Sequence, residues 1–418
     1  MDPLAVDPAT PIAPFAVARL PRVLFGSGRR AEIAVVAAEF GRRALVVTGA
    51  RSLQATPAWT EITSGLHGAG IAWEHLAVHG EPSPELVDAE VAIRRADPPD
   101  VVLGIGGGSA LDAAKAIAGL LRSGTTALDH LEGVGRGIPY PGPATPFIAV
   151  PTTAGTGSEA TKNGVLSGAG APFGGGPAGP YKKSFRDDRL MAAVAVVDPD
   201  LLAGCPPEVI AGDGLDALTQ CLEAYVSTGA SPYTDAVALS GLAAIGPALP
   251  AWHAAVRAGR PPSVATAART AMAWGAMASG IALANAGLGA IHGIMATLGV
   301  RHGVHHGTGC GILLAPATRV NARALRERDP GGPALRRYAD VGRLLAGDPT
   351  LAAEAAVDAL VARLAALAAE LGLPGLGALG VGEADIGVLV AESRGSSMRT
   401  NPIVLDDAEI GAILAEAR

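Results

Sequence analysis

Apolar and polar positions follow two different patterns along the chain, and the first pattern covers roughly the N-terminal half. Short apolar runs with the length of buried strands alternate there with stretches whose apolar residues recur at helical spacing. Strands are predicted at residues 22–28 (with a turn), 44–48, 71–78, 101–105, 147–150 and 194–198, and helices at 29–40, 85–96 and 110–121. Strands that alternate with helices predict βαβ units and a parallel sheet.

The second pattern begins near residue 206, where strand signals fade and long alanine-rich stretches show helical spacing. Helices are predicted at residues 207–226, 232–258, 263–283, 288–298, 311–321, 333–345, 351–371 and 406–416. We therefore predict an α/β domain over residues 1–203 and an all-helical domain over residues 204–418. Residues 1–20 are a proline-rich lead that we expect to be loosely ordered.

Composition narrows the class of protein. Of the 418 residues, 49% are apolar and 17% are charged, which is typical of a globular chain with a large core. A net charge of −7 without a basic stripe argues against a nucleic-acid partner. Three distant cysteines favour a reduced, cytoplasmic protein over a disulfide framework, and no CxxC zinc pattern is present. We expect neither a signal peptide nor a membrane span.

A glycine-rich loop follows the strand predicted at residues 101–105 and precedes the helix at 110–121. Its sequence is Gly106-Gly107-Gly108-Ser109. Free backbone N–H groups and the helix dipole at such a junction can hold a phosphate, although a bare GGGS is also compatible with a flexible turn. In the helix that follows, Asp112 could orient the loop, and we interpret Lys115 as a solvated surface charge.

A second polar loop, residues 151–163, carries four threonines around two glycines. Its hydroxyl groups could bind a ribose, a pyrophosphate or a nicotinamide amide, although a polar turn is the alternative. Lys162 lies at the end of this loop, where it is either a surface lysine or a cation that stabilises an alkoxide or a substrate carboxylate. The glycine- and proline-rich residues 168–180 predict a hairpin or a lid.

Histidines and one carboxylate suggest a metal centre in the helical half. Residues 288–307 hold four of the nine histidines: His292, His302, His305 and His306. Asp216 and Gln220 are four residues apart, so they share one helix face. His292 and His306 can complete a four-ligand set with this pair, because a divalent first-row ion accepts carboxylate and imidazole together.

Ordered motifs along nearly the whole chain resemble those of the iron-containing (group III) alcohol dehydrogenases. The motifs are RVLFGSG (22–28), GGGSALDAAK (106–115), PTTAGTGSEAT (151–161), VAVVDPDLL (194–202), GLDALTQCLEAY (214–225), His292…His306-Gly307 and SMRTNPIVL (397–405). The resemblance implies a Rossmann-like domain followed by a helical domain, the dehydroquinate synthase-like fold. It also implies hydride transfer between NAD or NADP and an alcohol or carbonyl compound, Fe²⁺ or Zn²⁺, and a homodimer or larger homo-oligomer.

The resemblance also assigns residues, and two positions depart from the family pattern. Asp216, His292 and His306 match metal ligands, but Gln220 stands where the family has a second-ligand histidine, and Ala296 replaces another family histidine. A neutral amide oxygen is a weak ligand for iron or zinc, so metal occupancy is open. The matching cofactor residues are Gly107, Gly108 and Ser109 for the pyrophosphate, Thr152, Thr153, Thr156 and Thr161 for the phosphates and nicotinamide, and Lys182 for a ribose.

The choice between NADP and NAD depends on the end of the strand at residues 44–48. Many NAD-specific members have an aspartate there, whereas this chain has Gly49, followed by Arg51 and Ser52. An acidic side chain would bind the ribose 2′-OH and repel a 2′-phosphate, so its absence favours NADP.

The resulting hypothesis is a metal-assisted alcohol dehydrogenase or carbonyl reductase, with Lys162, His302 and His305 as candidate proton carriers. Gln220 and Ala296 also favour a rival in the same class, a metal-independent reductase of the maleylacetate type. Rivals of another class are a lyase resembling dehydroquinate synthase, which uses NAD only transiently, and a cofactor-binding pseudoenzyme.

Overall fold

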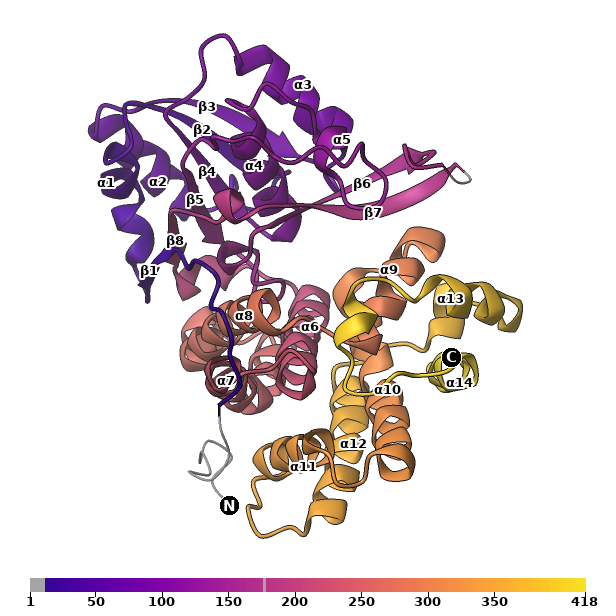
Figure 1. The fold of residues 1–418 in the computed structure, drawn as a ribbon. Coiled ribbons are helices and arrows are strands. Elements are labelled where there is room, and N and C mark those ends of the chain that lie inside the picture. The colour runs from indigo at the N-terminus through magenta and orange to yellow at the C-terminus, as the bar shows by residue number, and fades with distance from the viewer. Residues whose placement is uncertain (1–11, 176–177) are drawn as a thin grey trace. The chain divides into compact units, whose positions relative to one another are not determined.

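The structure is a computed structural model that describes residues 12–175 and 178–418 (Figure 1). The chain forms two compact units, Ala18–Cys205 and Pro206–Arg418, and the described residues 12–17 belong to the second. The domain boundary expected between residues 203 and 204 stays a prediction. Of the proline-rich lead, residues 1–11 lie outside the described residues, and residues 12–20 form neither helix nor strand.

The first unit is built on the predicted parallel sheet, which the structure confirms. Six strands pair in parallel in the order β1-β8-β5-β4-β2-β3. Their bounds are β1 (Arg22–Phe25), β2 (Arg43–Gly49), β3 (Ala72–Val78), β4 (Val101–Gly106), β5 (Phe147–Pro151) and β8 (Val194–Val197). The central strands β4 and β5 are buried over their whole length, as expected for a sheet covered on both faces.

Helices cover both faces of this sheet, and alternate strand residues separate the two layers. Leu45 and Val47 of β2 pack in one apolar cluster with side chains of α3 and α4, whereas Val46 packs in the other with side chains of α1 and α2. The helices are α1 (Ile33–Ala38), α2 (Pro57–Gly68), α3 (Pro84–Arg94), α4 (Gly108–Leu120) and the short α5 (Ala127–His130). Ser83 caps α3 by accepting a hydrogen bond from Leu86 N.

A two-stranded hairpin interrupts the α/β pattern after β5. Strands β6 (Asn163–Gly170) and β7 (Gly179–Arg186) pair antiparallel, and Figure 1 shows them extending away from the six-stranded sheet. The hairpin predicted at residues 168–180 is therefore confirmed, apart from residues 176–177, which lie outside the described residues. Its function as a lid stays a prediction.

The regular secondary structure in the described part of the second unit is all helical, as predicted. Its helices are α6 (Pro207–Val226), α7 (Pro232–Arg257), α8 (Thr266–Ala286), α9 (Ala290–His302), α10 (His306–Arg328), α11 (Pro333–Ala346), α12 (Ala353–Glu370), α13 (Ile386–Glu392) and α14 (Asp407–Glu416). Helix α6 is buried along nearly its whole length, and α7, α8 and α10 contact it. It is therefore the centre of this unit.

Helix α10 begins five residues earlier than the sequence predicted, because its glycines serve close packing and do not end the helix. A Cβ at Gly307 would collide with the backbone of Gly212 on α6, and a Cβ at Gly311 would lie 2.5 Å from Leu215 Cδ1. The glycines thus let α10 approach α6 closely, and tertiary packing outweighs their low helix propensity.

Helix α7 is long and apolar enough, by length and composition, to cross a membrane, and Pro262–Ala286 with Ala290–His302 passes the same test as a pair bent by 103°. More than half of the apolar window of α7, 56%, is buried inside the chain. A buried core helix has the same composition, so these helices are weak support for a membrane span.

Candidate metal centre and nucleotide loop

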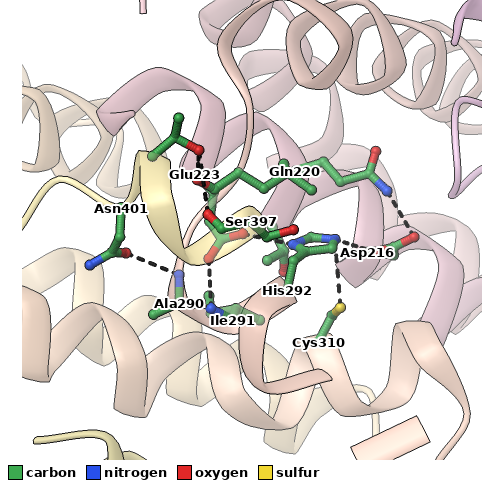
Figure 2. Close-up of polar contacts among 12 residues, drawn as sticks. Asp216, Gln220, Glu223, Ala290, Ile291, His292, Cys310, Ser397 and Asn401 are labelled. Atoms are coloured by element: carbon green, nitrogen blue, oxygen red, sulfur yellow. Dashed lines mark hydrogen bonds and ion pairs between the residues drawn. The ribbon is translucent and has the colours of Figure 1, made fainter. Parts of the chain in front are cut away.

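Four side chains from three helices bring metal-binding atoms together in the helical unit. Asp216 comes from α6, His292 from α9, and His306 and Cys310 from α10. One carboxylate oxygen, two imidazole nitrogens and one sulfur lie within 4.8 Å of one another. Figure 2 shows the imidazole of His292 joined by dashed lines to both Asp216 and Cys310. The arrangement unites three of the four predicted ligands and adds a cysteine that the sequence analysis gave no role.

Asp216 is the buried acceptor of this cluster. Its Oδ2 accepts a hydrogen bond from Gln220 Nε2 at 2.9 Å. Its Oδ1 is buried and lies 3.3 Å from His292 Nε2 and 3.7 Å from His306 Nε2, but it forms no hydrogen bond with any residue in the described part of the chain. Burial acts to raise the pKa of Asp216, but the charge of His306 and the interaction with His292 outweigh it and lower the pKa to about 2. Asp216 is therefore an ionised carboxylate.

Glu223 fixes the orientation of His292. The Nδ1 atom of His292 lies 2.7 Å from Glu223 Oε2, so that an N–H at Nδ1 can donate to this carboxylate oxygen. Glu223 Oε1 accepts from Ile291 N at 2.7 Å, which ties the same carboxylate to the first turn of α9. This leaves Nε2 of His292 facing Asp216 and Cys310, the carboxylate–histidine arrangement common behind metal ligands.

Gln220 lies beside the cluster but presents its amide nitrogen to it. Its Nε2 donates to Asp216, and its Oε1 lies 2.8 Å from the hydroxyl of Ser279 on α8. The ionised Asp216 can accept but not donate, so the NH₂ group must face it. The metal-ligand role predicted for Gln220 stays a prediction, and in this orientation its oxygen points away from the other donors.

Two features of the cluster were missed at the sequence level. Cys310 is four residues after His306 on α10, and Glu223 is seven residues after Asp216 on α6, so both lie on the ligand-bearing faces of their helices. Cys310 Sγ lies 3.9 Å from His292 Nε2, and burial raises the pKa of its thiol to about 12. None of the three cysteines forms a disulfide.

The other predicted histidines lie nearby in the chain but outside the donor set. His302 ends α9 and is half-buried, and the exposed His305 precedes α10, where its Nδ1 lies 3.4 Å from Thr308 Oγ1. Ala296 is an exposed residue of α9. The proposed proton transfer by His302 and His305 stays a prediction.

The glycine-rich loop lies at the carboxyl end of β4, where α4 begins. Added Cβ atoms at Gly107 and Gly108 would lie 3.3 Å from Thr153 Cγ2 and 2.8 Å from Thr156 Cγ2. The glycines therefore let the two polar loops meet, at the point where α4 exposes its free N–H groups. In the α/β unit this junction carries the following predicted residues, all half-buried: Gly107, Gly108, Ser109, Thr152, Thr153 and Thr156.

Lys115 is completely buried, so its interpretation as a solvated surface charge is wrong. Its ammonium group contacts Ser158 O at 2.8 Å, Ser158 Oγ at 3.0 Å, Thr161 Oγ1 at 3.1 Å and Asn163 O at 2.8 Å. The Ser158 hydroxyl in turn donates to Asp112 at 2.6 Å. Burial lowers the pKa of Lys115 to about 8, against the opposing charge of Asp112. The lysine ties the second polar loop to α4.

The remaining predicted residues of the α/β unit have protein partners. Thr161 is buried against Lys115, Lys162 Nζ lies 2.6 Å from Asp188, and Lys182 Nζ lies 3.0 Å from Glu81. Gly49 ends β2, and its carbonyl accepts a hydrogen bond from Gln54 Nε2 at 2.9 Å. Beside it, the buried Gln54 Oε1 forms no hydrogen bond with any of the described residues. The cofactor contacts of these residues stay predictions.

Two family models match the chain almost from end to end. The iron-containing alcohol dehydrogenase model matches residues 21–199, and the C-terminal model of the Fe-containing alcohol dehydrogenases matches residues 210–418. The chain belongs to the iron-containing alcohol dehydrogenase family. It is accordingly an NAD(P)-dependent oxidoreductase that acts on CH–OH groups.

Individual relatives agree with this assignment. The chain is 30% identical to a NAD-dependent methanol dehydrogenase of Bacillus methanolicus over 95% of this chain and 98% of that one. It is 35% identical to alcohol dehydrogenase 4 of Schizosaccharomyces pombe over 82% of this chain and 75% of that one. The crystal structure of a 1,3-propanediol oxidoreductase superposes with a TM-score of 0.84 at 28% identity, covering 97% and 100% of the two chains. These relatives do not favour the metal-free reductase, lyase or pseudoenzyme alternatives.

Proposed function

We propose that this chain oxidises a primary alcohol to an aldehyde, and reverses the reaction, with a divalent metal held by Asp216, His292 and His306. The observation that carries the proposal is the unsatisfied Oδ1 of Asp216, a buried anionic oxygen that faces two imidazole nitrogens. Buried polar atoms without partners are rare and costly, so one in this position indicates a missing ligand. A bound cation would satisfy it.

The donor set fits a divalent first-row metal. Carboxylate and imidazole are accepted together by such ions, and Glu223 holds His292 with Nε2 directed at the cluster. A metal there would supply Lewis acidity, drawing electron density from a substrate oxygen. The side chain of His306 is 35% exposed, so a substrate oxygen could reach the centre from the side on which His306 lies.

The α/β unit fits a dinucleotide. The N-terminus of α4, with Gly107, Gly108 and Ser109, would hold the pyrophosphate of the dinucleotide. The nicotinamide side of the dinucleotide would contact Thr152, Thr153 and Thr156. Gln54 Oε1, a buried acceptor beside Gly49, would receive a ribose hydroxyl. No acidic side chain stands at Gly49 to repel a 2′-phosphate, so we expect NADP to serve at least as well as NAD.

Oxidation of an alcohol moves a hydride from carbon to the nicotinamide and a proton from oxygen to a carrier. We keep Lys162, His302 and His305 as candidate carriers. Lys162 would first have to break its ion pair with Asp188, whose side chain is 69% exposed. A homo-oligomeric assembly belongs to the proposal through the family resemblance, and a cytoplasmic location belongs to it through the three distant cysteines.

The relatives' names suggest the substrate class. They include a methanol dehydrogenase, a long-chain alcohol dehydrogenase of Geobacillus thermodenitrificans and a sulfoacetaldehyde reductase of Bifidobacterium kashiwanohense solved with NAD⁺. Each of these substrates or products is a primary alcohol or an aldehyde. We therefore expect a panel of primary alcohols and aldehydes to contain a substrate.

The test uses the full chain purified without chelator. Metal content is measured by elemental analysis, and formation of reduced nicotinamide from NAD⁺ and NADP⁺ is followed with the alcohol panel before chelation, after chelation and after zinc or iron is restored. We expect bound metal, and activity that chelation removes and metal restores. Undiminished activity in metal-free protein would overturn the metal role and favour the maleylacetate type of reductase. The proposed reaction would be overturned if the protein neither formed reduced nicotinamide with any alcohol of the panel nor reduced any aldehyde.

A further inference from the structure

We propose that Cys310 takes the place of the missing histidine as the fourth protein ligand, so that the centre is Asp216, His292, His306 and Cys310 and favours zinc over iron. The proposal rests on the proposed function only in assuming that a metal binds at this cluster. It assigns Gln220 a different role, that of a positioning residue behind Asp216.

The distances fit a tetrahedral ion. Zinc ligands lie about 2.0–2.3 Å from the metal, so two ligand atoms at tetrahedral positions are about 3.3–3.8 Å apart. His292 Nε2 lies 3.3 Å from Asp216 Oδ1 and 3.9 Å from Cys310 Sγ, and His306 Nε2 lies 3.7 Å from Asp216 Oδ1. These three separations are close to tetrahedral spacing, and all four donor atoms, the sulfur included, lie within 4.8 Å of one another. Small side-chain movements would therefore bring them into one ligand shell.

Gln220 is directed away from this role by Asp216. The glutamine amide donates to Asp216 Oδ2 while its oxygen lies at the Ser279 hydroxyl, and rotating the amide would place two acceptor oxygens, Gln220 Oε1 and Asp216 Oδ2, against each other. The hydrogen bond instead holds the carboxylate so that Oδ1 faces the imidazoles. Gln220 thus orients a ligand without being one.

Charge balance and chemistry favour a thiolate. Metal binding would release the Cys310 proton to solvent, and one carboxylate with one thiolate then neutralises a divalent ion between two neutral imidazoles. A buried, neutral centre avoids the cost of an unpaired charge. Thiolate sulfur is a soft ligand that suits zinc, whereas a set of carboxylate and imidazoles alone does not discriminate against iron.

Four protein ligands would still leave room for a substrate oxygen, because catalytic zinc sites can accept a fifth ligand. Asp216, His292 and Cys310 are buried, so the open side of the centre is that of the half-buried His306. The cysteine therefore completes the buried side of the shell without blocking access.

Cobalt substitution tests the proposal without relying on activity. A thiolate ligand gives Co²⁺ a charge-transfer absorption in the near ultraviolet that carboxylate and imidazole ligands lack. We expect this band in the full-length wild-type chain and in Cys221→Ala, a matched variant of another buried cysteine, and its loss in Cys310→Ala. Zinc affinity should fall more than about 100-fold in Cys310→Ala, but only about 10- to 100-fold or less in Gln220→Leu, because removing a group behind a ligand costs no more than that.

Zinc X-ray absorption of the wild-type chain gives a second reading that needs no variant. We expect one sulfur neighbour at about 2.3 Å. Cobalt binding without the band, a band that survives in Cys310→Ala, or a zinc shell without sulfur would overturn the cysteine ligand. If the same protein still oxidises alcohols in a metal-dependent manner, the proposed function stands while this inference falls. A chain that binds neither cobalt nor zinc would overturn both the ligand assignment and the proposed metal role.

Discussion

Each of the two units buries a charged polar cluster, and the clusters differ in how completely their hydrogen bonds are satisfied. In the α/β unit, Lys115 has four oxygen atoms within hydrogen-bonding distance and Asp112 nearby. In the helical unit, Asp216 has one oxygen that accepts from Gln220 and one that faces two imidazole nitrogens but forms no hydrogen bond with any described residue. Lys115 and Asp216 are both buried, so solvent does not explain the difference.

The difference separates a structural cluster from a binding site. A fully satisfied buried network stabilises and orients the segments that it joins, here α4 and the loop of residues 158–163. A buried network with a missing partner is destabilising until a ligand supplies that partner. Substitutions in the first cluster should therefore change the stability of the protein, and substitutions in the second should change binding and catalysis.

The largest effect is expected from Asp216→Ala. Because the variant lacks the only carboxylate among the four donors, we expect loss of metal and a decrease in kcat/KM of at least about 10⁴-fold, which corresponds to about 5 kcal/mol in the activation barrier. Metal content and alcohol oxidation measure the two effects. Glu208→Ala on the exposed start of the same helix is the matched control and should keep both. Retained metal in Asp216→Ala would show that the unsatisfied oxygen is not a ligand.

A smaller effect, on stability, is expected from Lys115→Met. Methionine fills similar space but leaves the oxygens of Ser158, Thr161 and Asn163 without their donor, so we expect the free energy of unfolding to fall by about 3 kcal/mol. Denaturant unfolding of the apo chain measures it, with Lys183→Met on the exposed face of the hairpin as the control. Metal bound per folded chain should not change. Equal stability of the two variants would contradict the structural role.

The architecture could be predicted from the sequence because the spacing of apolar residues that distinguishes strands from helices is a property of neighbouring residues. The runs at residues 44–48 and 101–105 became β2 and β4, and residues 207–226 became α6 with the same bounds. The start of α10 was not readable, since its glycines resemble a helix end until the backbone of α6 is placed against them.

The site was readable only in part. Asp216, His292 and His306 were found through family motifs, but the contribution of Cys310 depends on α9 and α10 meeting, which spacing along one helix does not reveal. Lys115 was misassigned although a signal existed. Apart from Asp112 and Lys115, all residues from 110 to 120 are apolar or glycine. A helix that is apolar on nearly all its faces is buried.

The smallest effect is a pH dependence of stability in the Lys115 cluster, which tests whether this cluster is held by hydrogen bonds or by an ion pair. Glu159 is buried beside it, and burial raises the pKa of Glu159 to about 7 despite the opposing effect of Lys115. Between pH 4.5, the ordinary value, and pH 7, the folded chain keeps a proton that the unfolded chain loses. The glutamic acid therefore contributes stability below about pH 4.5 that is lost as pH rises towards 7.

Glu159→Gln should remove this dependence, because glutamine has no proton to lose. The unfolding free energy of wild type minus that of the variant should fall by on the order of 2 kcal/mol between pH 4.5 and pH 7. Denaturant unfolding at a series of pH values measures the difference, and Glu85→Gln at an exposed position of α3 is the control that should show no such slope. A difference that stays flat would mean that Glu159 is ionised in the folded chain, as a partner of the Lys115 ammonium. The cluster would then be a buried ion pair, and Lys115→Met would cost more than the loss of hydrogen bonds alone.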